Sequence, residues 1–120
     1  MSGKTQYTQI TPFTTQDGSE IRELMHPQQH EVENQSLAEA RVAPTKSTLL
    51  HKHLCSEEIY YITEGEGLMT LGDEQFKVTS GDTICIPPGT AHCITNTGDI
   101  ELVILCCCSP AYSDSDTQLL

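Results

Sequence analysis

From Ser47 onward, the chain is a regular succession of short strand-like segments separated by turn-forming residues. The breaks are rich in Gly, Pro, Asn and Asp, and Gly72-Asp73 fits a two-residue hairpin connection. The expected strands are residues 48–54, 58–63, 67–71, 75–78, 82–86, 91–95 and 101–107. Many short strands at even spacing are typical of a sandwich or barrel, so the sequence predicts an all-β fold.

The remaining residues complete one domain, as expected for a chain of 120 residues. Residues 1–18 read as a loose arm with a turn at 16–18, and a first strand is expected over 20–25, before Pro27. Residues 36–43 have some helix propensity, but the strands that follow favour a strand there. We therefore divide the chain into an N-terminal arm with the first strand (1–35), a barrel (36–110) and a polar C-terminal tail (111–120), loosely packed as far as Leu119.

The chain is strongly acidic, with a net charge of −11 from 17 acidic and six basic residues. Nucleic acids and anionic membranes are bound by clustered Lys and Arg, so the composition argues against both as partners. Residues 1–10 lack the apolar core of a signal peptide, and the longest apolar run, 102–108, has the length of a strand. We therefore expect a cytoplasmic protein.

The six cysteines are expected to be free thiols, because no secretion signal accompanies them. Three of them are contiguous at 106–108, so in a strand the middle one faces opposite to its neighbours, which argues against a zinc-thiolate site. Cys55, Cys85 and Cys93 are expected to be small apolar residues, buried or half-buried.

Three histidines and a glutamate have the chemistry of a metal site. His51 and His53 flank Lys52 in an expected strand, and because strand side chains alternate, both imidazoles point to one face. Glu58 opens the next strand, and His92 follows a Pro-Pro-Gly turn. Three imidazoles and one carboxylate are a borderline ligand set that suits Mn, Fe, Co, Ni, Cu or Zn.

These residues belong to a longer pattern that resembles the two-part signature of the cupin superfamily, whose members are small β-barrels of the jelly-roll type. The first part reads His51-x-His53, four residues, Glu58, six residues, Gly65, and the second reads Gly81, five residues, Pro87-x-Gly89, two residues, His92, three residues, Asn96. The family usually has glycine six residues before the first histidine, where this chain has Thr45. That position is a turn, so the departure concerns loop shape and not the ligands.

The resemblance implies that one divalent metal is bound inside the barrel by His51, His53, Glu58 and His92. Glu57 competes with Glu58 for the carboxylate role, and the six-residue gap to Gly65 favours Glu58. The resemblance thus adds a single-domain cupin barrel and a mononuclear site to the all-β prediction.

Other polar residues near the pattern have less defined roles. Tyr60 continues the inward face of Glu58, either as a wall residue or, with a pKa lowered beside a metal, as an acid-base group. Asn96 is expected to form structural hydrogen bonds rather than to bind metal. His26 and His30 lie outside the pattern in polar surroundings, so we expect both to be exposed to solvent.

Similar barrels host many activities, so the fold does not fix the function. We expect a metal-dependent enzyme, dioxygenase-like or isomerase- or cyclase-like, because this ligand set leaves up to two positions of an octahedral ion for a small oxygen-bearing substrate. The alternative is a non-catalytic module that binds or senses a metal or a small molecule. Residues 58–67 resemble mannose-6-phosphate isomerase-like cupins, but Lys52 points away from the histidines, which disfavours a sugar-phosphate substrate.

A second copy of the chain is the expected protein partner. Ile59 and Tyr61 alternate with Glu58 and Tyr60 and therefore face outward. Two large apolar side chains on one exposed face are more than the surface of a monomer requires for solubility. The N-terminal arm is also free to contact a second copy of the chain. The sequence therefore predicts a homodimer.

Overall fold

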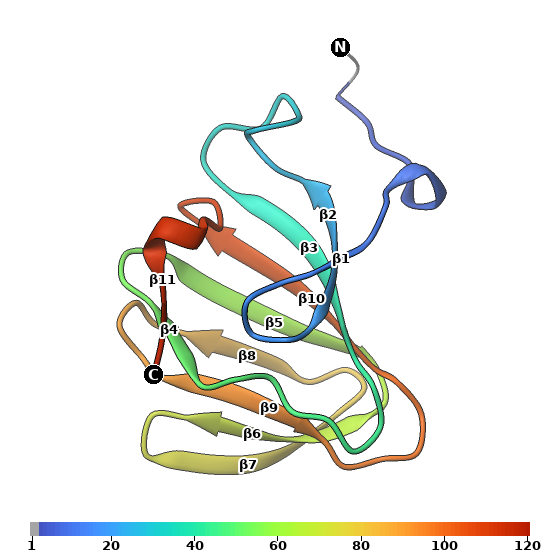
Figure 1. Cartoon of the computed structure of the whole chain (residues 1–120), viewed down its shortest axis with the longest axis vertical. Coiled ribbons are helices and arrows are strands. Elements are labelled where there is room, and N and C mark those ends of the chain that lie inside the picture. Colours follow the sequence, from blue (N-terminus) through green and yellow to red (C-terminus); the bar gives the residue numbers. More distant parts are fainter. Residues whose placement is uncertain (1–2) are drawn as a thin grey trace.

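The computed structural model describes residues 3–120, and strands form nearly all of its regular structure (Figure 1). The strands are β1 (Phe13–Thr14), β2 (Glu20–Met25), β3 (Ser36–Val42), β4 (His51–His53), β5 (Glu57–Glu64), β6 (Glu66–Leu71), β7 (Glu74–Thr79), β8 (Thr83–Ile86), β9 (His92–Asn96), β10 (Leu102–Ser109) and β11 (Thr117–Leu119). Two short 3-10 helices, η1 (Tyr7–Gln9) and η2 (Asp114–Asp116), complete this part of the chain. Neither is long and apolar enough to cross a membrane.

The strands form two antiparallel sheets that pack around one core (Figure 1). The first sheet has six strands in the order β1-β2-β3-β10-β5-β8, and the second has five in the order β11-β4-β9-β6-β7. The predicted all-β jelly-roll fold is therefore confirmed. The strands remain in two sheets rather than in one strictly closed barrel.

Alternation along the strands separates the core from the surface, as the period of two requires. In β5 the side chains of Glu58, Tyr60 and Ile62 are buried, and those of Glu57, Ile59 and Tyr61 between them are exposed. The largest buried apolar side chains come from both sheets and are Ile62, Met69, Ile86, Ile94, Leu102 and Ile104. Burying one such side chain contributes roughly 1.5–3 kcal/mol, so this layer is the main stabilising element of the domain.

Most predicted strands occur close to their expected positions. The segment favoured as a strand over a helix is β3, and Gly72-Asp73 connects β6 to β7 as a hairpin, with Gly72 at φ 58°. The strand predicted over 48–54 is shorter than expected, because only His51–His53 forms β4. The backbone N–H of Leu49, just before it, donates instead to the carbonyl of Asp17 at 2.8 Å.

The arm and the tail are both tied to the sheets. β1 pairs with β2, and β11 pairs with β4 so that Thr117 lies opposite His53. The expectation of loose packing, which in the tail extended only as far as Leu119, is therefore wrong at residues 13–14 and 117–118. The free edges of β2 and β4 would leave backbone N–H and C=O groups unpaired, and these short strands satisfy them.

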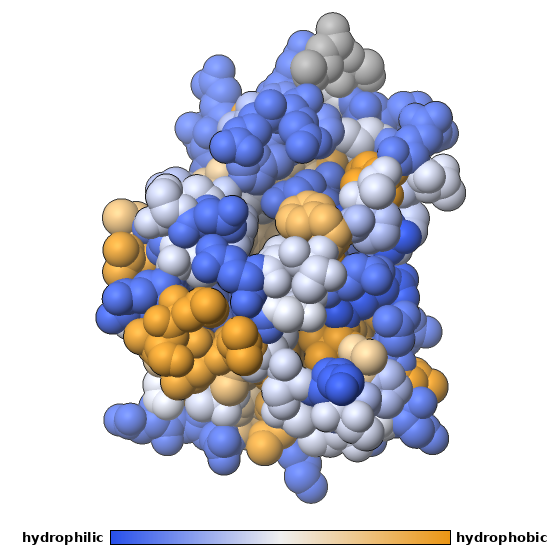
Figure 2. All heavy atoms as spheres, in the orientation of Figure 1, coloured by the Kyte–Doolittle hydropathy of each residue, from blue (hydrophilic) through white to orange (hydrophobic). Residues whose placement is uncertain are grey.

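The face of the molecule drawn in Figure 2 is mostly hydrophilic, as the acidic composition requires. One hydrophobic patch stands out beside the C-terminal strand (Figure 2). Leu50, Leu119 and Leu120 are exposed at this edge of the five-stranded sheet. A few exposed apolar side chains are normal on a domain surface, so the patch by itself assigns no function.

Candidate metal centre

The structure brings three of the predicted ligands together on the five-stranded sheet. His51 and His53 come from β4, and His92 comes from β9, where it pairs directly with His51. One ring nitrogen from each imidazole lies within 4.8 Å of the other two. All three side chains are buried, so their nitrogens converge in a space that solvent does not fill freely.

Hydrogen bonds to the far side of each ring fix its tautomer. The Nδ1 atoms of His51 and His92 lie 2.8 and 3.0 Å from the carbonyl oxygens of Leu49 and Thr90, respectively, so each Nδ1 carries a hydrogen and donates. The lone pair of a neutral ring then resides on Nε2, which faces the centre of the cluster. This is the arrangement found in histidines that bind metals.

His53 is held in the same tautomer by a hydroxyl group. Its Nδ1 lies 3.0 Å from Oγ1 of Thr117, and that hydroxyl donates its own hydrogen to the carbonyl of Ser113 at 2.9 Å. The Thr117 oxygen can therefore only accept from His53, which leaves the Nε2 lone pair of His53 toward the cluster.

Glu58 adds a buried carboxylate to the three imidazoles. Its Oε1 lies 3.1 Å from Nε2 of His53 and 3.5 Å from Nε2 of His92, and its Oε2 accepts a hydrogen bond from the Cys108 thiol at 3.3 Å. Burial opposes ionisation, but hydrogen bonds and positive charge from the facing His53 and His92 imidazoles in their protonated form outweigh it and lower the pKa of Glu58 to about 2. Glu57 is exposed on the opposite face of β5. Glu58 is therefore the carboxylate that reaches the histidines.

This set of atoms fits a metal cation. Nε2 of His92 is buried and has no hydrogen-bond partner among the residues that the structure describes. Burial and the neighbouring His92 lower the pKa of His51, which keeps that ring in the neutral form that metals need. Neutral ring nitrogens and a carboxylate oxygen facing one another repel unless a cation lies between them. Three nitrogens and one oxygen suit a borderline divalent ion.

Tyr60 and Asn96 lie near the site, and their contacts are structural rather than those of metal ligands. Burial raises the pKa of Tyr60 well above its usual range, which favours the protonated phenol, while an acid-base role beside a bound metal stays a prediction. Its ring packs edge-on against His92, with centroids 6.1 Å apart. The Asn96 amide donates to the carbonyls of Val42 and Ile100 at 2.9 and 2.8 Å, which confirms its structural role.

All six cysteines lie in the described part of the chain and are free, as predicted. Burial is the largest factor that raises the pKa values of Cys106 and Cys108, so these thiols remain protonated beside the site. The expectation of burial is wrong for Cys55 and Cys85, which are exposed, and correct for the half-buried Cys93. Cys55 follows β4 and Cys85 lies on the outer face of the edge strand β8, where no layer covers it.

The two histidines outside the pattern are not exposed as expected. His26 is buried, and its Nε2 donates to the carbonyl of Tyr112 at 2.7 Å, while its Nδ1 accepts from the N–H of Gln28 at 3.1 Å. His30 is half-buried, and its Nδ1 accepts from the backbone N–H of His26 at 2.9 Å. Both rings fix the turn after β2 rather than join the cluster.

Two residues near the histidine cluster were not predicted from the sequence. Asp17, in the turn between β1 and β2, places its Oδ2 3.8 Å from Nε2 of His51. Thr117, in β11, holds His53 from behind. The residues at 16–18 predicted a turn, but they did not indicate that this turn would lie next to His51. The polar tail contained no pattern that predicted its pairing with β4.

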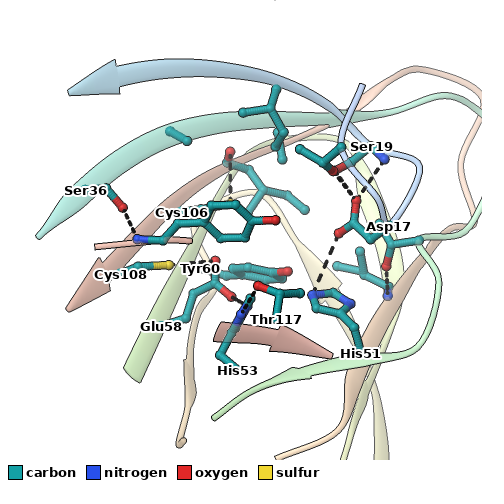
Figure 3. A pocket seen from close by; sticks show the side chains of 18 of the residues that line it. Asp17, Ser19, Ser36, His51, His53, Glu58, Tyr60, Cys106, Cys108 and Thr117 are labelled. Carbon is teal, nitrogen blue, oxygen red and sulfur yellow. Dashed lines mark hydrogen bonds and ion pairs between the residues drawn. The ribbon is translucent and has the colours of Figure 1, made fainter. Parts of the chain in front are cut away.

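A cavity lies beside the cluster, between the two sheets, with a volume of about 50 Å³. This volume exceeds what one water molecule needs. Figure 3 shows His51, His53 and Glu58 on one side of it, with Asp17 approaching His51 from the β1–β2 turn. Apolar side chains complete the wall, among them Ile21, Val42, Ile94 and Ile104.

The fold and the site together define a cupin. Residues 38–108 match the model of the cupin domain family, which is more than half of the chain, so the chain belongs to this family. It is 58% identical over 117 residues to an uncharacterised protein of Methanocaldococcus jannaschii, covering 98% of this chain and 94% of that relative. It is also 37% identical over 68 residues to the oxalate-binding protein of Thermotoga maritima, covering 57% of this chain and 56% of the relative.

Solved structures share the same architecture. A variant of Streptomyces Pac13 in complex with uridine has a TM-score of 0.82 at 16% identity, covering 100% of this chain and 92% of that one. A protein of Thermotoga maritima described as a predicted oxalate decarboxylase has a TM-score of 0.77 at 27% identity, covering 88% and 96%. The polyketide cyclase RemF of Streptomyces resistomycificus has a TM-score of 0.79 at 23% identity, covering 91% and 80%. The first and third of these similarities concern the fold alone.

Proposed function

We propose that this cupin binds one divalent transition metal per chain through His51, His53, Glu58 and His92. The observation that carries the proposal is the convergence of three ring nitrogens, with tautomers fixed from behind, on a buried carboxylate. Donors of this kind suit Mn, Fe, Co, Ni, Cu or Zn.

We propose further that the site serves a metal-dependent enzyme, of the dioxygenase or the isomerase or cyclase kind, acting on a small oxygen-bearing substrate. When bound, the metal would supply Lewis acidity to a substrate oxygen. The cavity beside the histidines gives a small molecule room to reach that position, and its apolar wall excludes bulk water. Tyr60 stays protonated and can therefore donate a hydrogen bond.

Metal analysis of the purified protein tests the site. We expect about one transition metal per chain in the wild type and a sharp fall in the double variant His51→Ala, His92→Ala, because two of the three convergent nitrogens are lost. His30→Ala is the matched control, since it removes an imidazole outside the cluster. Stoichiometric metal in the double variant would rule out the proposed ligands.

A non-catalytic binding or sensing module is the second candidate, and the name of the oxalate-binding relative favours it. Screening the metal-loaded protein against catechols, flavonols, enols and sugars separates the two. Oxygen consumption or isomerisation would support the enzyme. Saturable binding that raises the melting temperature without turnover would support the module. In either case, six free thiols support a location in a reducing compartment such as the cytoplasm.

A further inference from the structure

Asp17 is held in one orientation by its own turn. Its Oδ1 accepts hydrogen bonds from the hydroxyls of Thr15 and Ser19, each at 2.6 Å, and from the backbone N–H of Ser19 at 3.0 Å. Three donors on one oxygen fix the rotamer, and the other oxygen is left to face His51 (Figure 3). The Asp17 carbonyl also accepts from Leu49, which docks the turn onto the segment before β4.

The charge balance of the cavity depends on this carboxylate. A divalent ion and Glu58 alone would leave a single net positive charge, which attracts anions. Asp17 cancels that charge, and Glu23 brings a further acidic group to the same wall. The lining includes no lysine or arginine among the residues that the structure describes.

The nearby basic side chains are turned away from the cavity. Arg22 lies between two inward residues of β2, and its guanidinium packs over the ring of Tyr7 at 4.7 Å and approaches Glu39. Lys52 alternates with the buried His51 and His53 and therefore faces outward. A carboxylate or phosphate group in the cavity would thus meet acidic side chains without a compensating cation from the protein.

Glu23 provides an independent indication of what the cavity accepts. Its Oε2 is buried and has no hydrogen-bond partner within residues 3–120. Burial raises the pKa of Glu23, which shows that its surroundings penalise charge. A buried polar atom without a partner is costly, and a ligand that brings a hydrogen-bonding hydrogen into the cavity would satisfy it.

We infer that Asp17 is a specificity-determining residue, which makes the cavity select small uncharged molecules that carry a hydroxyl or amino group and reject dianions of the oxalate type. This inference rests on the proposed function, since it assumes a divalent ion at the histidines. Specificity here is achieved by repulsion of the wrong ligand as well as by contacts with the right one. The ligand's oxygen would face the metal, and its hydroxyl or amino hydrogen would face Asp17.

Two probes of equal shape and different charge test the inference. Oxalate is a dianion without donors, whereas oxamide is neutral, has nearly the same planar outline and carries N–H donors. We would measure the binding of both by calorimetry to the full chain loaded with Mn²⁺, after determining the metal content of each variant. We expect Asp17→Asn to tighten oxalate binding at least tenfold and to change oxamide binding less than threefold, because only the dianion is relieved of charge repulsion.

Glu57→Gln is the matched control, because it removes a negative charge from the exposed face of β5. It should change oxalate binding less than twofold. If Asp17→Asn fails to fold or to retain Mn²⁺, Glu23→Gln replaces it, with an expected tightening of about threefold. Equal oxalate affinity in the wild type and in the metal-loaded variant overturns the inference while the metal site stands. A wild type that binds no metal overturns both.

Discussion

Thr117 is the residue on which the orientation of His53 depends. Its hydroxyl accepts from the His53 imidazole and passes its own hydrogen to the Ser113 carbonyl, so a single oxygen fixes which ring nitrogen is free. Partners of this kind, behind a metal ligand, typically change metal affinity by 10–100-fold when removed. Valine has nearly the shape of threonine without the hydroxyl, which makes the contribution of this one group measurable.

We therefore predict that Thr117→Val weakens metal binding by about 10–100-fold, as measured by competition with a chelator. Thr117→Ser keeps the hydroxyl and should stay within about threefold of the wild type. A purely structural role for the methyl group would reverse this order, with serine weaker than valine. Equal affinities in all three proteins would show that His53 is oriented without the hydroxyl.

At the scale of elements, η2 and β11 are fastened to the end of β4 by Asp116. Its two carboxylate oxygens accept from the backbone N–H groups of Cys55 and Ser56 at 2.8 and 3.0 Å. Slight burial opposes ionisation, but these hydrogen bonds outweigh it and lower the pKa of Asp116 below its ordinary value of 3.8. Because the folded pKa lies below the unfolded one, the ionised group stabilises the fold above the unfolded pKa. That stabilisation is lost as the pH falls through the folded pKa.

Asp116→Asn should therefore lower the melting temperature at neutral pH by roughly 4 °C, and the gap to the wild type should close below about pH 4. The comparison is a pH series of thermal unfolding curves, in which the difference between the two proteins isolates this one group. Asp99→Asn, which alters an exposed aspartate in a loop, should show no such convergence. A gap that stays constant down to low pH would mean that Asp116 acts through something other than its charge.

Local periodicity accounts for what the sequence could predict about the site. His51 and His53 share a face because they are two residues apart in a strand, and Glu58 faces inward where Glu57 does not for the same reason. Thr117 could not be predicted, because it reaches a histidine 64 residues away through the pairing of β11 with β4. The position of Asp17 near His51 could not be predicted either. An aspartate is common in such a turn because it accepts a hydrogen bond from the backbone N–H two residues on, here that of Ser19, so its presence needed no further explanation.

The same distinction explains the errors elsewhere in the fold. The strand positions follow from turn residues and alternation, which are local. The burial of His26 depends on the carbonyl of Tyr112, which lies 86 residues further along the chain. Cys55 and Cys85 are exposed because Cys55 lies beyond the end of β4 and Cys85 lies in an edge strand. The alternation of residues within one strand does not indicate which strands or layers lie beside it.

For the whole molecule, the outer face of the six-stranded sheet is where we propose that two copies meet. Ile59 and Tyr61 are 42% and 43% exposed, in agreement with the outward direction expected of them. Ile59 lies beside Cys85 on one side and Cys107 on the other, and Cys107 pairs with the exposed Leu37. These side chains form an apolar row across four strands, of the kind that interfaces between copies bury.

Analytical ultracentrifugation tests this homodimer. We predict a mass of two chains for the wild type at micromolar concentration and of one chain for the double variant Ile59→Glu, Tyr61→Glu, because charge on this face opposes its burial. Leu120→Glu places a charge on the separate patch beside β11 and should leave the dimer intact. A wild type with the mass of one chain contradicts the prediction, and a dimer broken by Leu120→Glu would place the interface at the other patch.

Strand β10 carries both surfaces at once. Cys106 and Cys108 line the cavity, whereas Leu105 and Cys107, at the alternate positions, face the outside of the sheet. Mutations at alternate codons of one strand can therefore alter the ligand and the partner separately. During evolution, substitutions at the inward positions of β10 can therefore change which ligand the protein binds while the proposed homodimer is kept. Substitutions at the outward positions can change the homodimer while the ligand is kept.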